Sequence, residues 1–218
     1  MDKKTLQNIR MMKYFIDATQ QIIENESFDL VTARKVSNLA GFNSATIYNY
    51  FKNLDELLYF SCIKYLADYS KDKYDIVNTK NHKNTFEYYI NIWKCFCYHS
   101  YRNPKIYFHL FFTNHTLCES SIEEYFEMIF DDIDDTAKKL LPSLLKENIY
   151  DKNLSLLNSF VKNNIVFEKN LNALNEMIIC IYQSMLYNIL NNLVDYSIDT
   201  ATEKTLKYIN QTILSYTL

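Results

Sequence analysis

The sequence of 218 residues contains one glycine and two prolines, where average usage would give about 15 glycines. Tight β-hairpin turns, dinucleotide-binding turns and phosphate-binding loops all depend on glycine. So little glycine therefore argues against sheet proteins and glycine-rich nucleotide sites together. Apolar residues make up 48% of the chain, which is enough for a sizeable buried core. We expect an all-α protein.

Long apolar runs and paired cysteines are also missing. The longest uninterrupted apolar run covers only Met177 to Tyr182, whereas a membrane span needs about 20 residues. The five cysteines form no CxxC spacing, and nothing at the N-terminus resembles a secretory signal. We therefore expect a cytoplasmic protein with reduced thiols and no membrane partner. No HExxH motif, nucleophile elbow or carboxylate pair stands out, so we expect no enzyme and no catalytic residue.

Two groups of side chains could bind a metal ion or another ligand, but we expect neither to have a functional role. Cys95 and His99 lie one helical turn apart and could supply two ligands to a soft metal ion. No second pair with ligand spacing accompanies them, so we expect core or pocket residues, no metal site and no cofactor. The acidic run at residues 131–135 is most simply a solvated helix face.

The charges are unevenly distributed along the chain. Between Leu30 and Leu54 there are three basic residues, Arg34, Lys35 and Lys52, and no acidic residue. The whole chain carries 23 basic and 26 acidic side chains, a formal charge of −3. This stretch is therefore the only plausible contact for a polyanion on an otherwise acidic protein.

The same region has the pattern of three helices. Apolar residues at helical spacing predict a first helix from about Lys4 to Glu26. Thr32 can cap a second helix from Ala33 to Ala40, and the single glycine, Gly41, must end it. A third helix is predicted from Ser44 to Phe51. Two short helices joined by a tight turn form a helix-turn-helix, which presents its second helix to the DNA major groove.

Helical signals continue to the C-terminus. Asn53 and Glu56 form a capping box, with Glu56 reaching back to the cap amide, that opens a helix to about Lys71. A second capping box, at Ser121 and Glu124, opens a helix that Pro142 ends or kinks. The other predicted helices cover residues 85–101, about 103–112, 171–193 and a last segment capped by Asp199.

Residues 15–24 and 28–58 resemble the N-terminal domain of the TetR family of transcriptional regulators. The residues that stand at the family's positions with its spacing are Thr32, Ala40, Gly41, Thr46, Tyr48, Phe51 and Leu57. The resemblance implies a DNA-binding domain over residues 1–53 and a helical effector-binding and dimerisation domain over residues 54–218. It also implies a homodimer that binds a palindromic double-stranded DNA operator as a repressor and is released by a small molecule.

A helix-turn-helix divides its side chains between bases and phosphates. The side chains expected to reach base edges are Ser44, Ala45, Thr46 and Asn49. Arg34 can reach guanine or phosphate, and the side chains suited to phosphate are Thr32, Tyr48, Tyr50 and Lys52. Thr32 also reads as a plain helix cap, and Lys35 as a solvated surface charge. Leu54 replaces a lysine that contacts phosphate in many family members, so we expect one phosphate contact fewer in each subunit.

The middle of the chain is rich in aromatic residues. Aromatic stripes often build ordinary cores, but aromatics with a few polar groups also line ligand pockets. The resemblance places an effector pocket here, and the composition predicts an unidentified effector that is largely apolar or aromatic. The residues expected to line the pocket are Tyr89, Trp93, Phe96, Phe111, Phe126, Tyr182 and Met185.

The predicted helix at residues 171–193 is apolar on nearly every side and must be covered on every side. The resemblance implies that the last two helices pair with their copies as a four-helix dimer interface. Two other functions also fit the sequence. One is an all-helical enzyme or binding protein that turns over or stores a pocket ligand, and the other is a coactivator of the same fold that binds another protein.

Overall fold

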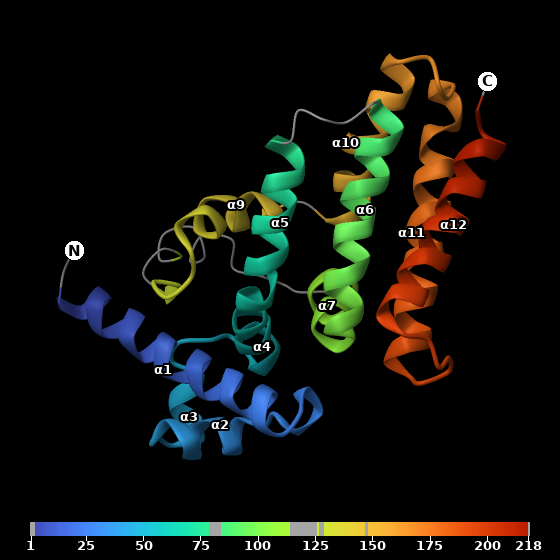
Figure 1. Cartoon of the computed structure of the whole chain (residues 1–218). Coiled ribbons are helices and arrows are strands. Elements are labelled where there is room, and N and C mark those ends of the chain that lie inside the picture. Colours follow the sequence, from blue (N-terminus) through green and yellow to red (C-terminus); the bar gives the residue numbers. More distant parts are fainter. Residues whose placement is uncertain (1–2, 79–83, 114–125, 127–128, 147, 218) are drawn as a thin grey trace. The chain divides into compact units, whose positions relative to one another are not determined.

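The computed structural model describes residues 3–78, 84–113, 126, 129–146 and 148–217. These residues form helices, with one isolated β-bridge between Val166 and Thr217 and no extended strand among them (Figure 1). The prediction of an all-α fold is confirmed. None of the helices in the described ranges combines the length and hydropathy needed to span a bilayer.

The chain separates into two compact units. The first consists of Met1–Ala67 with Phe112–Pro142, and the second of Asp68–Phe111 with Ser143–Leu218. The predicted boundary between residues 53 and 54 concerns where DNA binding ends and effector binding begins, and it stays a prediction.

The first unit is built around one long helix. Helix α1 packs against both α2 and α4 (Figure 1). It buries an apolar stripe that includes Ile9, Met12, Phe15 and Ile16, which is the face that the helical periodicity predicted. The helices of this part of the chain are α1 (Lys3–Asn25), the short 3₁₀ turn η1 (Phe28–Leu30), α2 (Ala33–Ala40), α3 (Ser44–Ile47) and α4 (Leu54–Ile63).

The third helix is shorter than the sequence predicted. Helix α3 ends at Ile47 instead of Phe51. Tyr48 has φ −74° and ψ −3°, and the amide of Asn49 then bonds the carbonyl of Thr46 at 3.2 Å. A ψ near zero favours such i to i+3 bonds, so the last turn tightens. The tight turn directs Phe51 into the core, where 1% of its surface is exposed.

The capping box that opens α4 forms with one difference. The Asn53 side chain accepts from the amide of Glu56 at 2.8 Å, as predicted. The Glu56 carboxylate accepts from the amide of Lys52 at 2.5 Å instead of from the amide of Asn53. The helical path also continues beyond the predicted end at Lys71, through the 3₁₀ turn η2 (Lys64–Leu66) and α5 (Ala67–Asn78).

The acidic residues of the run at 131–135 are exposed, as predicted, but they do not form a helix face, because only Asp135 lies in a helix. Asp131 pairs with Lys13, and Asp132 pairs with Lys64 at 2.9 Å. Burial opposes ionisation of Asp132, but its hydrogen bond and ion pair with Lys64 outweigh burial and lower its pKa. The Asp134 side chain accepts from the amide of Thr136 at 2.9 Å, at the start of α9 (Asp135–Lys146). The run therefore forms ion pairs at the surface of the first unit and begins a helix.

Pro142 lies inside α9 and does not end it, since the helix continues to Lys146. The predicted capping box at Ser121 and Glu124 lies outside the described residues. The last helix is capped by Ser197, whose hydroxyl accepts from the amide of Thr200 at 3.1 Å, and not by Asp199. Asp199 cannot be the N-cap because it already lies within the first turn of the helix, which begins at Ile198.

The second unit is a bundle of longer helices. Helices α6, α11 and α12 lie side by side, and α10 packs against α6 and α11 (Figure 1). Helix α10 was not predicted from the sequence, and α11 ends three residues before the predicted Leu193. The further helices of this unit are α6 (Thr85–Arg102), α7 (Pro104–Phe112), α10 (Ile149–Lys162), the 3₁₀ turn η3 (Glu168–Asn170), α11 (Leu171–Leu190) and α12 (Ile198–Ser215).

Candidate DNA-binding surface and ligand pocket

Three local signals position the two short helices of the first unit. The Thr32 hydroxyl accepts from the amide of Lys35 at 3.2 Å and caps α2. Gly41 follows α2 with φ +79°, a left-handed conformation that costs a residue with a Cβ about 1 kcal/mol or more. The Asn43 side chain then accepts from the amide of Ala45 at 2.9 Å and caps α3. The helix-turn-helix is therefore specified by residues within a few positions of each turn.

The inner side of this motif is held by apolar contacts. Val36 and Ile47 are fully buried. The Phe15 ring of α1 lies 5.5 Å from the Phe42 ring and 6.5 Å from the Phe51 ring, measured between centroids. Because both ends of α3 are anchored in this way, the opposite side of α3 is held outward.

The predicted DNA contacts all lie on the segment from Thr32 to Lys52, and most of them face outward. Three of the nine are half-buried: Ser44, Thr46 and Tyr50. The Tyr50 ring lies 6.1 Å from the Phe15 ring, so it also contributes to the core. The six exposed side chains are Thr32, Arg34, Ala45, Tyr48, Asn49 and Lys52. Their contact with DNA stays a prediction.

The positive charge of this surface comes mainly from two residues. The Lys35 ammonium pairs with the Glu26 carboxylate at 2.5 Å, which largely cancels its charge. Within the described ranges, Arg34 and Lys52 form no ion pair. A segment without acidic residues that carries two such cations suits contact with phosphates.

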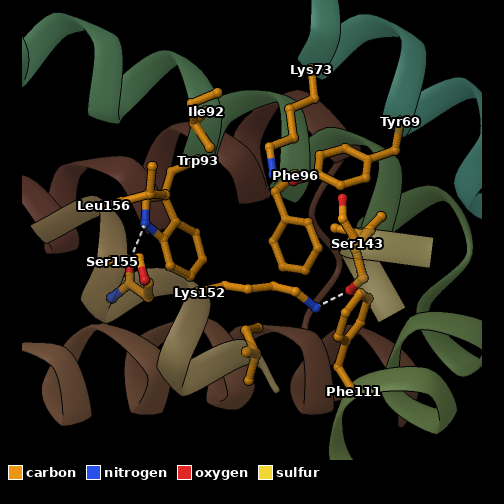
Figure 2. Close-up of a pocket in the computed structure, with 13 residues that line it drawn as sticks. Tyr69, Lys73, Ile92, Trp93, Phe96, Phe111, Ser143, Lys152, Ser155 and Leu156 are labelled. Atoms are coloured by element: carbon orange, nitrogen blue, oxygen red, sulfur yellow. Dashed lines mark hydrogen bonds between the residues drawn. The ribbon is translucent and has the colours of Figure 1, made fainter. Parts of the chain in front are cut away.

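A cavity of about 390 Å³ lies within the second unit (Figure 2). Its wall is mostly apolar and aromatic, with contributions from Trp93 and Phe96 of α6 and Phe111 of α7. Two lysines, Lys73 of α5 and Lys152 of α10, also line it. Figure 2 shows the Lys152 side chain extended beside Phe96 toward Phe111. The cavity therefore joins an apolar interior to cationic groups.

The structure brings together only part of the predicted pocket set. Trp93, Phe96 and Phe111 line the cavity. The Tyr182 ring is fully buried and packs against Trp93 and Phe96, with centroids 5.4 and 5.1 Å apart.

The other predicted pocket residues lie elsewhere. Tyr89 is buried next to the cavity, bonded to a residue of its wall, and Met185 is buried on α11 without lining the cavity. Phe126 belongs to the first unit. Their role in effector binding stays a prediction.

A buried hydrogen-bond network forms one wall of the cavity. The Asn153 side-chain oxygen accepts from the Tyr89 hydroxyl at 2.8 Å and from the Trp93 indole N–H at 3.0 Å. The Asn153 side-chain nitrogen donates to the Asn175 oxygen at 2.8 Å. Burial raises the pKa of Tyr89, so its hydroxyl remains a donor. The network fixes the orientation of the Trp93 ring.

Sequence reasoning missed Lys73, Lys152 and Asn153 as lining residues. Lys152 and Asn153 lie on α10, for which no helix was predicted. Their signal was the helical spacing of buried residues at Ile149, Asn153, Leu157 and Phe160. Asn153 interrupts an otherwise apolar stripe, and a lone polar residue in such a stripe points to a buried hydrogen bond.

No family model matches the sequence, and no curated protein matches it. Solved structures do match over nearly the whole chain, and they define the class: the chain has the fold of TetR-family transcriptional regulators.

The similar structures include three with TM-scores between 0.55 and 0.60. A TetR-family repressor, FadR from Thermus thermophilus in complex with lauroyl-CoA, has a TM-score of 0.60 at 12% identity, with 95% of each chain covered. A TetR-family regulator from Syntrophomonas wolfei has a TM-score of 0.57 at 12% identity, covering 94% of this chain and 95% of that one. The fatty acid degradation regulator FadR from Bacillus halodurans has a TM-score of 0.55 at 13% identity, covering 93% and 94%.

Proposed function

We propose that the chain is a DNA-binding transcriptional regulator, a homodimeric repressor that a small molecule releases from a palindromic operator. The observation that carries this proposal is the outward face of the helix-turn-helix. Six of the nine predicted DNA contacts are exposed there, while Ile47 and Phe51 of the same segment are buried. The fold it shares with known transcriptional regulators supports the same function.

Dimerisation accounts for apolar side chains that a single chain leaves in water. On α11, Met177 is 44% exposed and Tyr187 is 50% exposed. On α12, Tyr208 is 41% exposed and Leu214 is 58% exposed. Exposed apolar patches of this kind mark interaction surfaces. A second copy of the chain that pairs its own α11 and α12 with these helices would cover them.

The effector follows from the chemistry of the cavity. Its aromatic wall suits an apolar body, and its volume falls within the range of small-molecule pockets. Lys73 and Lys152 add two ammonium groups, which favour an anionic end on the same molecule. The Thermus thermophilus FadR was solved with lauroyl-CoA, a ligand with both features. We therefore propose an amphipathic anion, such as a fatty acyl compound, as the effector.

Release from DNA would follow from a change in the distance between the two copies of α3, one in each subunit of the proposed dimer. A dimer must place them about 34 Å apart, or a suitable multiple, to enter successive major grooves. An effector that binds better to a differently spaced form shifts the population toward that form. The coupling is typically about 1–3 kcal/mol, and DNA must weaken effector binding by the same factor. The extent of release can be no larger than the difference in the effector's affinity for the two forms.

Base readout and phosphate contact give different mutational signatures, which test the DNA-binding surface. Thr46→Ala or Asn49→Ala should relax preference at particular base pairs by about 1–3 kcal/mol. Lys52→Ala should weaken binding to every sequence alike and reduce the salt slope by about one for each subunit. Fluorescence anisotropy with the chain's own upstream DNA, at several salt concentrations, measures both effects.

Lys35→Ala is the matched control, because the Lys35 ammonium is already paired with Glu26. We expect its salt slope to stay close to that of the unmodified chain. Equal losses at all base substitutions in the Thr46 and Asn49 variants would refute their assignment to readout. A chain that binds no palindromic DNA at any salt concentration would refute the regulator itself. It would favour an enzyme or storage protein if a ligand is converted or retained, and a coactivator if a stable hetero-complex forms.

The pocket proposal is tested by removing one positive charge. Lys152→Met keeps most of the side-chain length but loses the ammonium, and a hydrogen bond to a charged group is worth about 1.5–3 kcal/mol. We therefore expect laurate to bind about 10- to 100-fold more weakly in calorimetry. Dodecanol, which has the same chain without the charge, should bind nearly equally to both proteins.

Lys162→Met is the control on the same helix, because Lys162 is exposed and does not line the cavity. It should leave laurate binding unchanged. If Lys152→Met weakens dodecanol as much as laurate, Lys152 acts through packing and not through its charge.

A further inference from the structure

A second group of reactive side chains lies in the second unit and takes no part in lining the cavity. It consists of Asp72 on α5 and of Cys95 and His99 on α6. Each offers one ligand atom, and the carboxylate oxygen, the sulfur and the ring nitrogen all lie within 4.8 Å of one another. The sequence showed only the pair on α6, and the packing of α5 against it supplies the third group.

The three groups differ in exposure in a way that leaves an open side. His99 is 8% exposed, Cys95 is half-buried and Asp72 is exposed. The His99 Nε2 atom lies 2.8 Å from an Asp72 carboxylate oxygen, so these two groups already face each other. The Asp72 side chain is 58% exposed, so the cluster opens to solvent on that side. An ion can therefore enter from solvent, and a water molecule can complete its coordination.

The donor set is selective for a class of metal ion. Sulfur, imidazole nitrogen and a single carboxylate oxygen suit zinc and similar transition-metal ions, and do not suit magnesium or calcium, which prefer oxygen alone. Ligand atoms about 2.0–2.3 Å from a tetrahedral zinc ion lie about 3.3–3.7 Å from one another. To reach that spacing, the 2.8 Å contact between Asp72 and His99 must widen, and any contact of the Cys95 sulfur near 4.8 Å must narrow by about 1 Å.

We propose that Asp72, Cys95 and His99 bind a zinc-like divalent transition-metal ion, with a water molecule as the fourth ligand. The thiolate and the carboxylate together balance the two positive charges of the ion, so the half-buried site carries no net charge. Binding forms a metal–sulfur bond and sends the thiol proton to solvent.

The site would join α5 to α6 next to the cavity. The Tyr69 ring lines the cavity and lies 5.9 Å from the His99 ring and 5.2 Å from the Phe96 ring. Lys73, which also lines the cavity, directly follows Asp72. A bound ion would therefore hold one wall of the cavity in place. The proposal does not depend on DNA binding or on the nature of the effector.

Cobalt(II) titration of the full chain tests the site, because a cysteine thiolate bound to cobalt gives a charge-transfer absorption band. We expect one equivalent per chain to produce the band and zinc to abolish it. Cys95→Ser should lose the band, and Asp72→Asn and His99→Asn should each weaken zinc binding at least about 10-fold. Cys180→Ser, which changes an exposed cysteine on α11, should keep the full band.

A measurement on the unmodified chain removes any dependence on how the variants fold. Zinc should slow alkylation of Cys95 by iodoacetamide at least about 10-fold, as a bound thiolate is protected, and should leave Cys180 unchanged. Zinc should also raise Tm by several degrees, since an ion that binds only the folded chain stabilises it. A cobalt band that persists in Cys95→Ser, or unchanged alkylation of Cys95 in zinc, would overturn the proposal.

Discussion

Asn153→Leu should destabilise the second unit by about 2–6 kcal/mol, because it leaves two buried donors without an acceptor at about 1–3 kcal/mol each. Asn153 is 2% exposed and Tyr89 is 1% exposed, so bulk water does not reach the Tyr89 hydroxyl to replace its lost bond. Leucine has the same number and branching of side-chain heavy atoms as asparagine and leaves no cavity, so the loss reports mainly the missing hydrogen bonds. The Asn175 side chain loses its bond to Asn153 as well.

Urea unfolding of the full chain measures this effect. Trp93 is the single tryptophan, and its indole N–H belongs to the network, so its fluorescence reports the second unit directly. Asn158→Leu is the control, because Asn158 is exposed on the same helix. It should change the free energy of unfolding by no more than about 0.5 kcal/mol. A loss below 1 kcal/mol in Asn153→Leu would mean that the network contributes little to stability.

Phe15→Ala should cost the first unit about 3–5 kcal/mol, the usual range for removing a buried phenylalanine. The Phe15 side chain is fully buried, and the rings of Phe42, Tyr50 and Phe51 lie 5.5, 6.1 and 6.5 Å from it. These three rings flank α3 on both sides. The substitution should therefore make α3 less well ordered, and it should lower both DNA affinity and the free energy of unfolding.

Hydrogen exchange measured by mass spectrometry shows whether Phe15→Ala destabilises the first unit alone or the second unit as well. We expect faster exchange in peptides covering residues 33–63 and unchanged exchange in peptides from α11. Tyr14→Ala is the matched control, because Tyr14 is the preceding residue and is 56% exposed. A Phe15→Ala chain that keeps normal exchange over α2 and α4 would show that Phe15 does not anchor the motif.

Local signals in the sequence determined both ends of α2 and the start of α3, but not the end of α3, which lies at Ile47 instead of Phe51. Thr32 and Gly41 fix the two ends of α2, and each acts on backbone groups within a few residues. The structure confirms α2 over Ala33–Ala40, as predicted. The predicted DNA contacts also come from one continuous segment, so helical periodicity was enough to place most of them on the outer side.

Contacts between residues distant in sequence were decided only by the tertiary structure. Asp132 pairs with Lys64 and Asp72 meets His99, and no local pattern states which charges will meet. The cavity wall likewise combines five helices, so Lys152 could not be assigned to it before α10 was placed against α6 and α7. Caps and turns depend on hydrogen bonds across a few residues, whereas ion pairs and cavities depend on how whole helices pack. For that reason the exposed side chains of the helix-turn-helix could be predicted from the sequence. The lining of the cavity and the cluster of Asp72, Cys95 and His99 could not.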